Sequence, residues 1–488
     1  MDNSATILER AFAAYNAGRY GEAEAVCHQL AESGLRDGQL FFLLGMALHK
    51  LDRDIEAIQW LKRASQLQPD RARAWAGLGT VWQKLEDFKK AARYFRRAAE
   101  LEPQQANHFY NLGNAIYPLN DLEGAAGAFQ RAVELNPRDA ESWNNLGKCL
   151  KELNRVDEAV TAYDRAVQLK PDYAKAQQGR AICLLSAGRL AEGFRDYECR
   201  WHTLARRQFA APVWDGRAIP GKTLFLHAEQ GFGDGIQSAR YARLARERCA
   251  RVILECRPPL KTLFQNSGVA DEVIAFGENI PPADFVTSVI SLPGLLGFTL
   301  EKLPGQVPYL AAPAARPGMA AAPGTAKVGL VWAGSPTHCD DANRSLPLAL
   351  LAPVLAVPGI SFFSLQMPVP KRDAAALADC PQLTSLGKFK DYLQTAAAVA
   401  ELDLVISVDT SVAHLAGALA KPVWTLVQFA QDWRWFPQFG DRTPWYPTMR
   451  LFRQTERGNW GPVVARVAAE LGQGVQQWKD HGVFPVPA

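Results

Sequence analysis

Residues 74–103 read AWAGLGTVWQKLEDFKKAARYFRRAAELEP, in which small and bulky apolar residues form two blocks around a short polar turn. The pattern returns along the chain at a constant interval. A leucine followed by glycine recurs at Leu44, Leu78, Leu112 and Leu146, and a proline recurs at Pro69, Pro103, Pro137 and Pro171. Repetition at an interval of about 34 residues predicts an all-helical solenoid, in which each unit is a pair of helices stacked on the next pair.

The sizes of the repeated side chains fit this packing. An aromatic residue opens each unit, at Phe41, Trp75, Phe109 and Trp143, and a bulky residue stands between two alanines, at Leu61, Phe95, Phe129 and Tyr163. Small residues let two helices approach closely, large residues fill the space between them, and proline ends the second helix. The pattern resembles the tetratricopeptide repeat, and the resemblance covers residues 1–205, with atypical units at both ends.

Side-chain amides recur on the predicted solenoid at Asn111, Asn114 and Asn145. Asn111 and Asn145 occupy equivalent positions in successive repeats, and Asn114 follows the first of them by one helical turn. Amides spaced along a solenoid can pair with the backbone of an extended polypeptide, because each amide carries both donors and an acceptor. We therefore predict that these residues bind a protein; the alternative is a stable solenoid without chemistry of its own.

The segment HAEQGFGDGIQSARY, residues 227–241, follows a short apolar run and precedes a predicted helix. Glycine at such a junction lets the backbone approach a ligand, at an entropic cost. The motif lacks the Gly-Lys-Ser/Thr of a P-loop, and Ile236 replaces the third glycine of the dinucleotide motif. What remains is Asp234, which is either a helix cap or a general base. His227 and Glu229 are rival bases in the same segment.

After residue 205 the sequence changes from helical repeats to alternating β-rich and helical runs, which predict parallel α/β units. The first unit covers residues 221–309. A segment rich in alanine, proline and glycine, residues 310–326, predicts a linker, and a second unit covers residues 327–488. Two such units enclose a cleft, and ligands bind at the carboxyl ends of their strands.

Residues 405–422 read VISVDTSVAHLAGALAKP, which predicts a strand followed by a helix. Asp409 is expected to cap the helix, so that the N–H groups of Thr410 and Ser411 point out of its N-terminus. The hydroxyls of these two residues add donors, and His414 lies within the first turn. The arrangement predicts an anion site; the alternative is an ordinary cap with a buried histidine.

Three motifs together resemble the family-9 glycosyltransferases, the heptosyltransferase-like proteins of the GT-B fold. They are GFGD at residues 231–234, VGLVWAGSP at 328–336 and DTSVAHLAGALAKP at 409–422. The resemblance covers about residues 221–471 and implies two Rossmann-like units that face a cleft. It also implies an inverting transferase without a cofactor, which uses a nucleotide-sugar as co-substrate and Asp234 as its base.

Residues that contact the donor follow mainly from the same resemblance. They are Gly233, Ser335, Arg344, Gln366, Asp409, Thr410, Ser411 and His414. Gln366 stands where the family carries an acidic residue that touches the donor ribose, so it could form a hydrogen bond but carries no charge. Trp433, Trp435 and Trp445 could stack on a base or a sugar, although packing in a core is the favoured interpretation.

Composition excludes several classes of partner and site. The formal net charge of +4 lacks the basic excess that is typical of nucleic-acid binding. Eight cysteines without a C-x-x-C pair favour reduced thiols over disulfides or a zinc site. No metal site is predicted, although Asp340 and Asp341 are adjacent. The first residues do not resemble a signal peptide and no run predicts a transmembrane segment, so we expect a cytoplasmic protein.

A tetratricopeptide array ahead of a GT-B unit resembles the intracellular protein glycosyltransferases, including the O-GlcNAc transferase type and flagellin-modifying enzymes. This resemblance favours a protein acceptor held by the repeats. The predicted activity is the transfer of a sugar to an acceptor hydroxyl. Two alternatives are a transferase that acts on a lipid-linked or polysaccharide glycan, and an inactive adaptor in which only the repeats function.

Overall fold

The computed structural model describes residues 4–202, 207–314, 319–338 and 340–486. The chain divides into two compact units, Met1–Arg180 and Ala181–Ala488, here called unit 1 and unit 2. The predicted boundaries at residues 1, 205 and 488 and residues 315–318 of the predicted linker lie outside the described ranges. Within those ranges, no helix is both long and apolar enough to cross a membrane.

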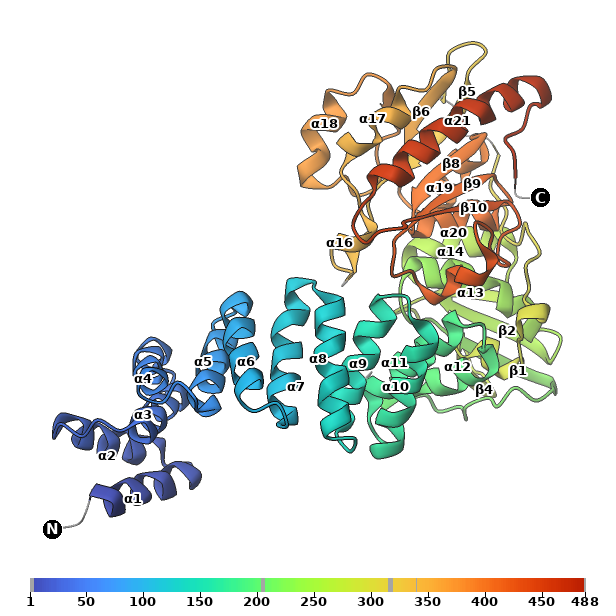
Figure 1. Ribbon diagram of the computed structural model, residues 1–488. Helices are drawn as coiled ribbons and strands as arrows, with labels where there is room; N and C mark the ends of the chain where they lie inside the picture. The colour runs from blue at the N-terminus through green and yellow to red at the C-terminus, as the bar shows by residue number, and fades with distance from the viewer. Residues whose placement is uncertain (1–3, 203–206, 315–318, 339, 487–488) are drawn as a thin grey trace. The chain divides into compact units, whose positions relative to one another are not determined.

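Unit 1 is built of helix hairpins (Figure 1). The first helices of four successive hairpins are α3 (Gly38–Lys50), α5 (Ala72–Lys84), α7 (Ala106–Ile116) and α9 (Ala140–Glu152). Their partners are α4 (Asp54–Leu67), α6 (Phe88–Leu101), α8 (Leu122–Leu135) and α10 (Val156–Leu169). An opening pair consists of α1 (Ser4–Asn16) and α2 (Tyr20–Glu32), and the interval continues with α11 (Ala174–Ser186) and α12 (Leu190–Tyr197). The helices of these four hairpins start at the constant interval of the sequence repeat, so the predicted solenoid is confirmed.

The repeated glycine of each hairpin lies directly against the bulky residue of the second helix. A methyl group added to the glycine would come within 2.6–3.0 Å of that residue, in the pairs Gly45–Leu61, Gly79–Phe95, Gly113–Phe129 and Gly147–Tyr163. Contacts this short are not tolerated by carbon atoms, so only glycine lets the two helices pack at their observed distance. The bulky residues are buried, with Phe95 and Phe129 each 1% exposed.

Unit 2 contains two parallel sheets. The first, sheet A, has the spatial order β3 (Glu272–Ala275), β2 (Cys249–Cys256), β1 (Ile219–His227) and β4 (Phe285–Ser288). Helix α13 (Phe232–Ala245) contributes Ile236 and Ala239 to the same buried cluster as Leu224 and Leu226 of β1. Residues of β1 that point to the other face, such as Phe225, belong to a separate small cluster.

Sheet B, the second sheet of unit 2, is doubly wound. Its spatial order is β10 (Met449–Arg453), β9 (Val423–Val427), β8 (Leu404–Val408), β5 (Ala326–Val331), β6 (Ile360–Ser364) and β7 (Leu383–Ser385), and all neighbours are parallel. The chain moves outward from β5 to β7 and then returns to β8 on the other side of β5. A crevice opens where the strand order reverses in this way, at the carboxyl ends of β5 and β8. The predicted region of parallel sheets after the solenoid is therefore confirmed.

Gly113→Ala is expected to destabilise unit 1, because the new methyl group meets the Phe129 ring at 2.7 Å. The loss in free energy of unfolding should be about 1–3 kcal/mol, which is usual for overpacking. Gly127→Ala is the matched control, because no side chain and no other helix lies within 4 Å of the added methyl group. Alanine should raise stability there by about 0.5–1 kcal/mol. Urea unfolding followed by circular dichroism measures both changes, and equal effects of the two substitutions would contradict this packing.

Candidate functional site

A pocket of about 520 Å³ occupies the crevice at the carboxyl ends of β5 and β8. On the sheet B side it is lined by residues that follow β5, β6 and β8 and by the start of helix α20 (Ser411–Ala418). On the sheet A side it is lined by the first turn of α13. The described residues that line it and that the sequence predicted are Gly233, Asp234, Ser335, Arg344, Asp409, Thr410, Ser411 and His414.

Asp234 lies at the third position of α13, and both of its oxygens are held. Oδ2 accepts the backbone N–H of Gly231 at 2.9 Å, and Oδ1 accepts from Arg434 Nη2 at 2.6 Å. Gly231, not Asp234, occupies the cap position, so the alternative interpretation of Asp234 as the N-cap is wrong in register. The carboxylate reaches back to the helix start from within the first turn and remains 23% exposed to the pocket.

Arg434 is the main residue of this pocket that the sequence analysis missed. It lies in the short helix Trp433–Trp435, beyond the carboxyl end of β9. Its side chain donates to Asp234, to Gln237 Oε1 at 2.6 Å and to Asp432 Oδ1 at 2.8 Å. Its position in the sequence could have identified Arg434, because it follows β9, which lies next to β8 in sheet B. Residues that follow neighbouring parallel strands gather at the same edge of the sheet.

Helix α20 begins without a side-chain cap. Thr410 occupies the cap position and makes no capping hydrogen bond, and the prediction that Asp409 caps the helix is wrong. The carboxylate of Asp409 instead accepts from the indole N–H of Trp435 at 2.7 Å, because this fully buried ring needs an acceptor. Burial raises the pKa of Asp409 to about 6, and the negative charge of Asp432 adds to the shift.

The hydroxyls at the start of α20 are positioned by neighbours. Ser411 Oγ and the hydroxyl of Tyr392 are 2.7 Å apart, and Thr410 Oγ1 lies 2.9 Å from Ser407 Oγ. Both residues line the pocket, where no side chain of a described residue caps the first N–H groups of α20. Uncapped N–H groups at a helix N-terminus favour an anion.

His414 is a neutral, buried ring at the contact between α13 and α20. Its Nδ1 lies 2.9 Å from the hydroxyl of Tyr446, and the ring stacks on Trp435 with centroids 5.2 Å apart. Burial lowers the pKa of His414 to about 3. A methyl group on Gly233 would come within 3.1 Å of this ring, so a larger residue would require the ring to shift by a few tenths of an ångström.

Arg344 and Ser335 line the pocket from the segment after β5. Arg344 Nε donates to Asp341 Oδ1 at 3.2 Å, and Ser335 Oγ lies 2.9 Å from Thr337 Oγ1. Asp341 also accepts from a serine hydroxyl, and Asp340 accepts from an asparagine amide, so both carboxylates have neighbours. Across the described residues, no three His, Cys, Asp or Glu side chains are grouped as metal ligands.

Gln366 does not take the predicted role of a donor contact. It is 4% exposed and does not line the pocket. Its Oε1 accepts the backbone N–H groups of Trp332 and Ala333, and its Nε2 donates to the carbonyls of Ala333 and Pro368. The amide therefore links the segments that follow β5 and β6, and no hydrogen-bonding capacity is left for a ribose hydroxyl.

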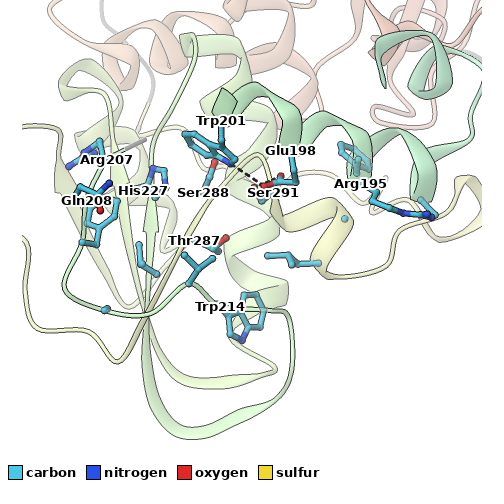
Figure 2. A pocket seen from close by; sticks show the side chains of 18 residues that line it. Arg195, Glu198, Trp201, Arg207, Gln208, Trp214, His227, Thr287, Ser288 and Ser291 are labelled. Carbon is cyan, nitrogen blue, oxygen red and sulfur yellow. Dashed lines mark hydrogen bonds between the residues drawn. The ribbon is translucent and has the colours of Figure 1, made fainter. Parts of the chain in front are cut away.

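The rival bases His227 and Glu229 lie outside this pocket. Glu229 accepts from the buried Arg200 at 2.8 and 3.1 Å and from Ser288. His227 is buried at the end of β1 and lines a separate pocket (Figure 2). Of the three candidate bases in the glycine-rich segment, only Asp234 lines the crevice of sheet B.

The remaining predicted residues pack as follows. Trp433, Trp435 and Trp445 are at most 7% exposed and belong to the core of unit 2. This is the role that the sequence analysis favoured over stacking on a base or a sugar. In unit 1, Asn145 Nδ2 donates to Asn114 Oδ1 at 3.1 Å, so these two amides meet between α7 and α9. Asn111 lies on the same helix as Asn114 and is partly exposed.

Comparison with known families assigns the helical region. The model of the tetratricopeptide repeat matches residues 8–72, 77–140, 110–174 and 146–198. Unit 1 is a tetratricopeptide-repeat solenoid. Its resemblance to this repeat in sequence is therefore confirmed.

Among curated proteins, Protein FlbA of Caulobacter vibrioides is 28% identical over 313 residues. The match covers 57% of this chain and 52% of that protein, so it spans about half of the relative's length. Among solved structures, the repeat protein YrrB, described as having an unusual peptide-binding site, is 23% identical with a TM-score of 0.34, covering 36% of this chain and 91% of its own. MamA is 21% identical with a TM-score of 0.32, covering 33% of this chain and 93% of its own.

Asp409→Asn should change how stability depends on pH. Because the folded-state pKa is raised to about 6 from an ordinary 3.8, the folded chain loses stability as the pH rises through this range. Relative to the wild type, the variant should gain up to about 3 kcal/mol between pH 4 and pH 7. Denaturant unfolding followed by tryptophan fluorescence measures the difference, with the exposed Asp379→Asn as control. Parallel pH profiles for wild type and Asp409→Asn would contradict the assignment.

Proposed function

We propose that unit 2 is an inverting, metal-independent glycosyltransferase of the GT-B fold, with sheets A and B in its two Rossmann-like halves. It transfers a sugar from a nucleotide-sugar to an acceptor hydroxyl. The observation that supports this most is the meeting of two helix N-termini around one pocket. The start of α13 carries a carboxylate, and the start of α20 presents uncapped N–H groups.

The α20 side suits the phosphates of a nucleotide-sugar. The leaving group gains negative charge as the bond from the anomeric carbon to the phosphate oxygen breaks. N–H groups of α20, the hydroxyl of Ser411 and the guanidinium of Arg344 all line the pocket and stabilise such charge. His414 is neutral, so it acts there as a hydrogen-bonding ring and not as a cation.

The α13 side suits a general base. Asp234 accepts the proton of the acceptor hydroxyl while the acceptor oxygen attacks the anomeric carbon from the face opposite the phosphate, and the configuration is inverted. The backbone N–H of Gly231 donates to one carboxylate oxygen of Asp234 and Arg434 donates to the other. Each oxygen therefore keeps a lone pair that can accept the proton of the acceptor hydroxyl. General-base assistance of this kind contributes about 10²- to 10⁴-fold to the rate.

The acceptor in this proposal is a protein held by unit 1. Tetratricopeptide repeats form extended surfaces that bind polypeptides, and the repeats cover most of unit 1. Amides of Asn111, Asn114 and Asn145 stand on first helices of successive repeats, where they could pair with an extended backbone. The contact between Asn114 and Asn145 orients both amides.

Asp234→Asn should lower transfer by about 100-fold or more, because the amide keeps the shape but accepts no proton. Nucleotide binding, measured as thermal stabilisation by nucleoside diphosphates, should stay near that of the wild type.

Arg344→Ala should mainly affect binding, because a phosphate loses a charged donor. Nucleotide binding should weaken by about 1–3 kcal/mol. Release of nucleotide from a panel of nucleotide-sugars measures turnover. Full turnover by Asp234→Asn would remove the carboxylate from the mechanism.

The double substitution Asn111→Ala with Asn145→Ala should slow modification of a protein acceptor and leave slow hydrolysis of the donor by water unchanged. The reason is that the amides bind the acceptor backbone and lie in unit 1, whereas the proposed donor pocket lies in unit 2. Gln130→Ala, on the second helix α8, is the matched control for loss of an exposed amide. Mass spectrometry of the modified acceptor measures the rate. Wild-type modification by the double variant would contradict binding through these amides.

A further inference from the structure

A second pocket of unit 2 lies at the edge of sheet A, beside its edge strand β4. The segment of residues 207–214, here called the cover segment, runs from the face of the sheet opposite α13 to the edge of β4. Phe209 packs on Phe225 with ring centroids 5.6 Å apart. The backbone N–H of Trp214 donates to the backbone carbonyl of Val286 in β4 at 2.8 Å. Between the cover segment, β4 and the end of α12 lies a cavity of about 590 Å³ (Figure 2).

The floor of this cavity is polar. Thr287 and Ser288 of β4 and Ser291 just beyond it are all buried. Ser291 Oγ donates to Glu198 Oε1 at 2.7 Å and accepts from Arg200, and Ser288 Oγ donates to Glu229, so these hydroxyls are fixed in direction. Figure 2 shows the hydroxyl of Thr287 directed into the cavity. An apolar ligand would offer no hydrogen bond to Thr287 and would remove the half-exposed carboxylate of Glu198 from water.

The walls of the cavity are aromatic. Trp201 and Phe209 lie on two sides of His227, with centroids 6.0 and 5.1 Å from its ring. The indole N–H of Trp201 donates to Glu198 Oε2 at 3.0 Å, which fixes the plane of the ring. The Arg200 guanidinium lies over one face of the indole, 4.4 Å from the ring centroid, so the other face is the apolar surface that Trp201 can offer to a ligand.

Two of the three guanidinium groups at the cavity are paired with carboxylates, and the third, Arg195, is exposed and extends away from the other labelled side chains (Figure 2). Arg207 forms a two-point ion pair with Glu255 at 2.5 and 3.1 Å, and the buried Arg200 is shared between Glu198 and Glu229. The carboxylate of Glu198 also lines the cavity and is 45% exposed. Paired guanidinium groups beside a half-exposed carboxylate do not favour an anion, whereas the crevice presents the uncapped N–H groups of α20 to one.

We propose that this cavity binds a pyranose ring of a glycan. A pyranose is neutral, has an apolar face of C–H groups and carries hydroxyls around its edge. The apolar face matches Trp201, and the hydroxyls match Thr287, the side chain of Gln208 and the carboxylate of Glu198. Amphipathic, uncharged ligands are the class that a pocket with aromatic walls and a few fixed polar groups selects. The inference does not rest on the transferase proposal, because no described residue lines both pockets.

Saturation-transfer difference NMR of the full chain with free glucose, mannose, N-acetylglucosamine and rhamnose tests the proposal. At least one sugar should receive saturation from the wild type. Thr287→Val and Gln208→Ala should each weaken its affinity about three- to tenfold, the effect of one lost hydrogen bond. Trp201→Ala should abolish the signal.

Two controls separate this cavity from other sites. Thr425→Val removes a buried threonine hydroxyl from β9 of sheet B and should leave sugar binding unchanged. Ser411→Ala tests the crevice: loss of the sugar signal there, with Thr287→Val unaffected, would place the sugar in the other pocket and overturn the proposal. Absence of saturation transfer from all four sugars would also overturn it, as would Thr287-dependent binding of inorganic phosphate or indole instead.

Discussion

The crevice of unit 2 depends on the pairing of a buried cation, the guanidinium of Arg434. It is 9% exposed and is paired with Asp234 and Gln237 of α13 and with Asp432 of its own loop. Burying a guanidinium away from water costs several kcal/mol of folding free energy unless its donors are paired. These three partners therefore make the burial of Arg434 tolerable. Because the partners come from both sides of the crevice, this pairing holds α13 against the segment after β9. It also fixes the direction of the one carboxylate of the glycine-rich segment that faces the pocket.

Close approach through glycine recurs in both units. In unit 1, the glycine after each repeated leucine lies against a buried bulky residue of the second helix, as Gly79 does against Phe95. In unit 2, Gly233 lets the start of α13 approach His414 of α20. The two cases have different consequences. In the solenoid the contact sets the spacing between the two helices of a hairpin. In unit 2 it brings two helix N-termini to one pocket, one with a carboxylate and one with uncapped N–H groups.

The segment after β1 separates two pockets of different character. His227, at the end of β1, lines the cavity under the cover segment, and Gly231 lines the crevice of sheet B. Between them, Glu229 is tied to Arg200 and Gln230 Nε2 donates to the hydroxyl of Tyr197. The crevice contains the paired charges of Asp234 and Arg344 and the uncapped start of α20, and the cavity contains paired charges and fixed hydroxyls. One loop thus divides the crevice that we propose binds a nucleotide-sugar from the cavity that we propose binds a pyranose.

The sequence by itself determined the repeats, the parallel strands and the group of residues at the strand ends. These depend on local spacing: a constant interval repeats the same contacts, and residues after parallel strands meet at one edge. Tertiary structure alone decided the partners. A local motif predicts Asp409 as a cap, but its carboxylate accepts a hydrogen bond from the buried indole of Trp435 instead. The amide of Gln366 forms its hydrogen bonds with backbone groups after β5 and β6. Arg434 reaches Asp234 across 200 residues of sequence, a pairing that no local pattern encodes because only the packed core brings the two together.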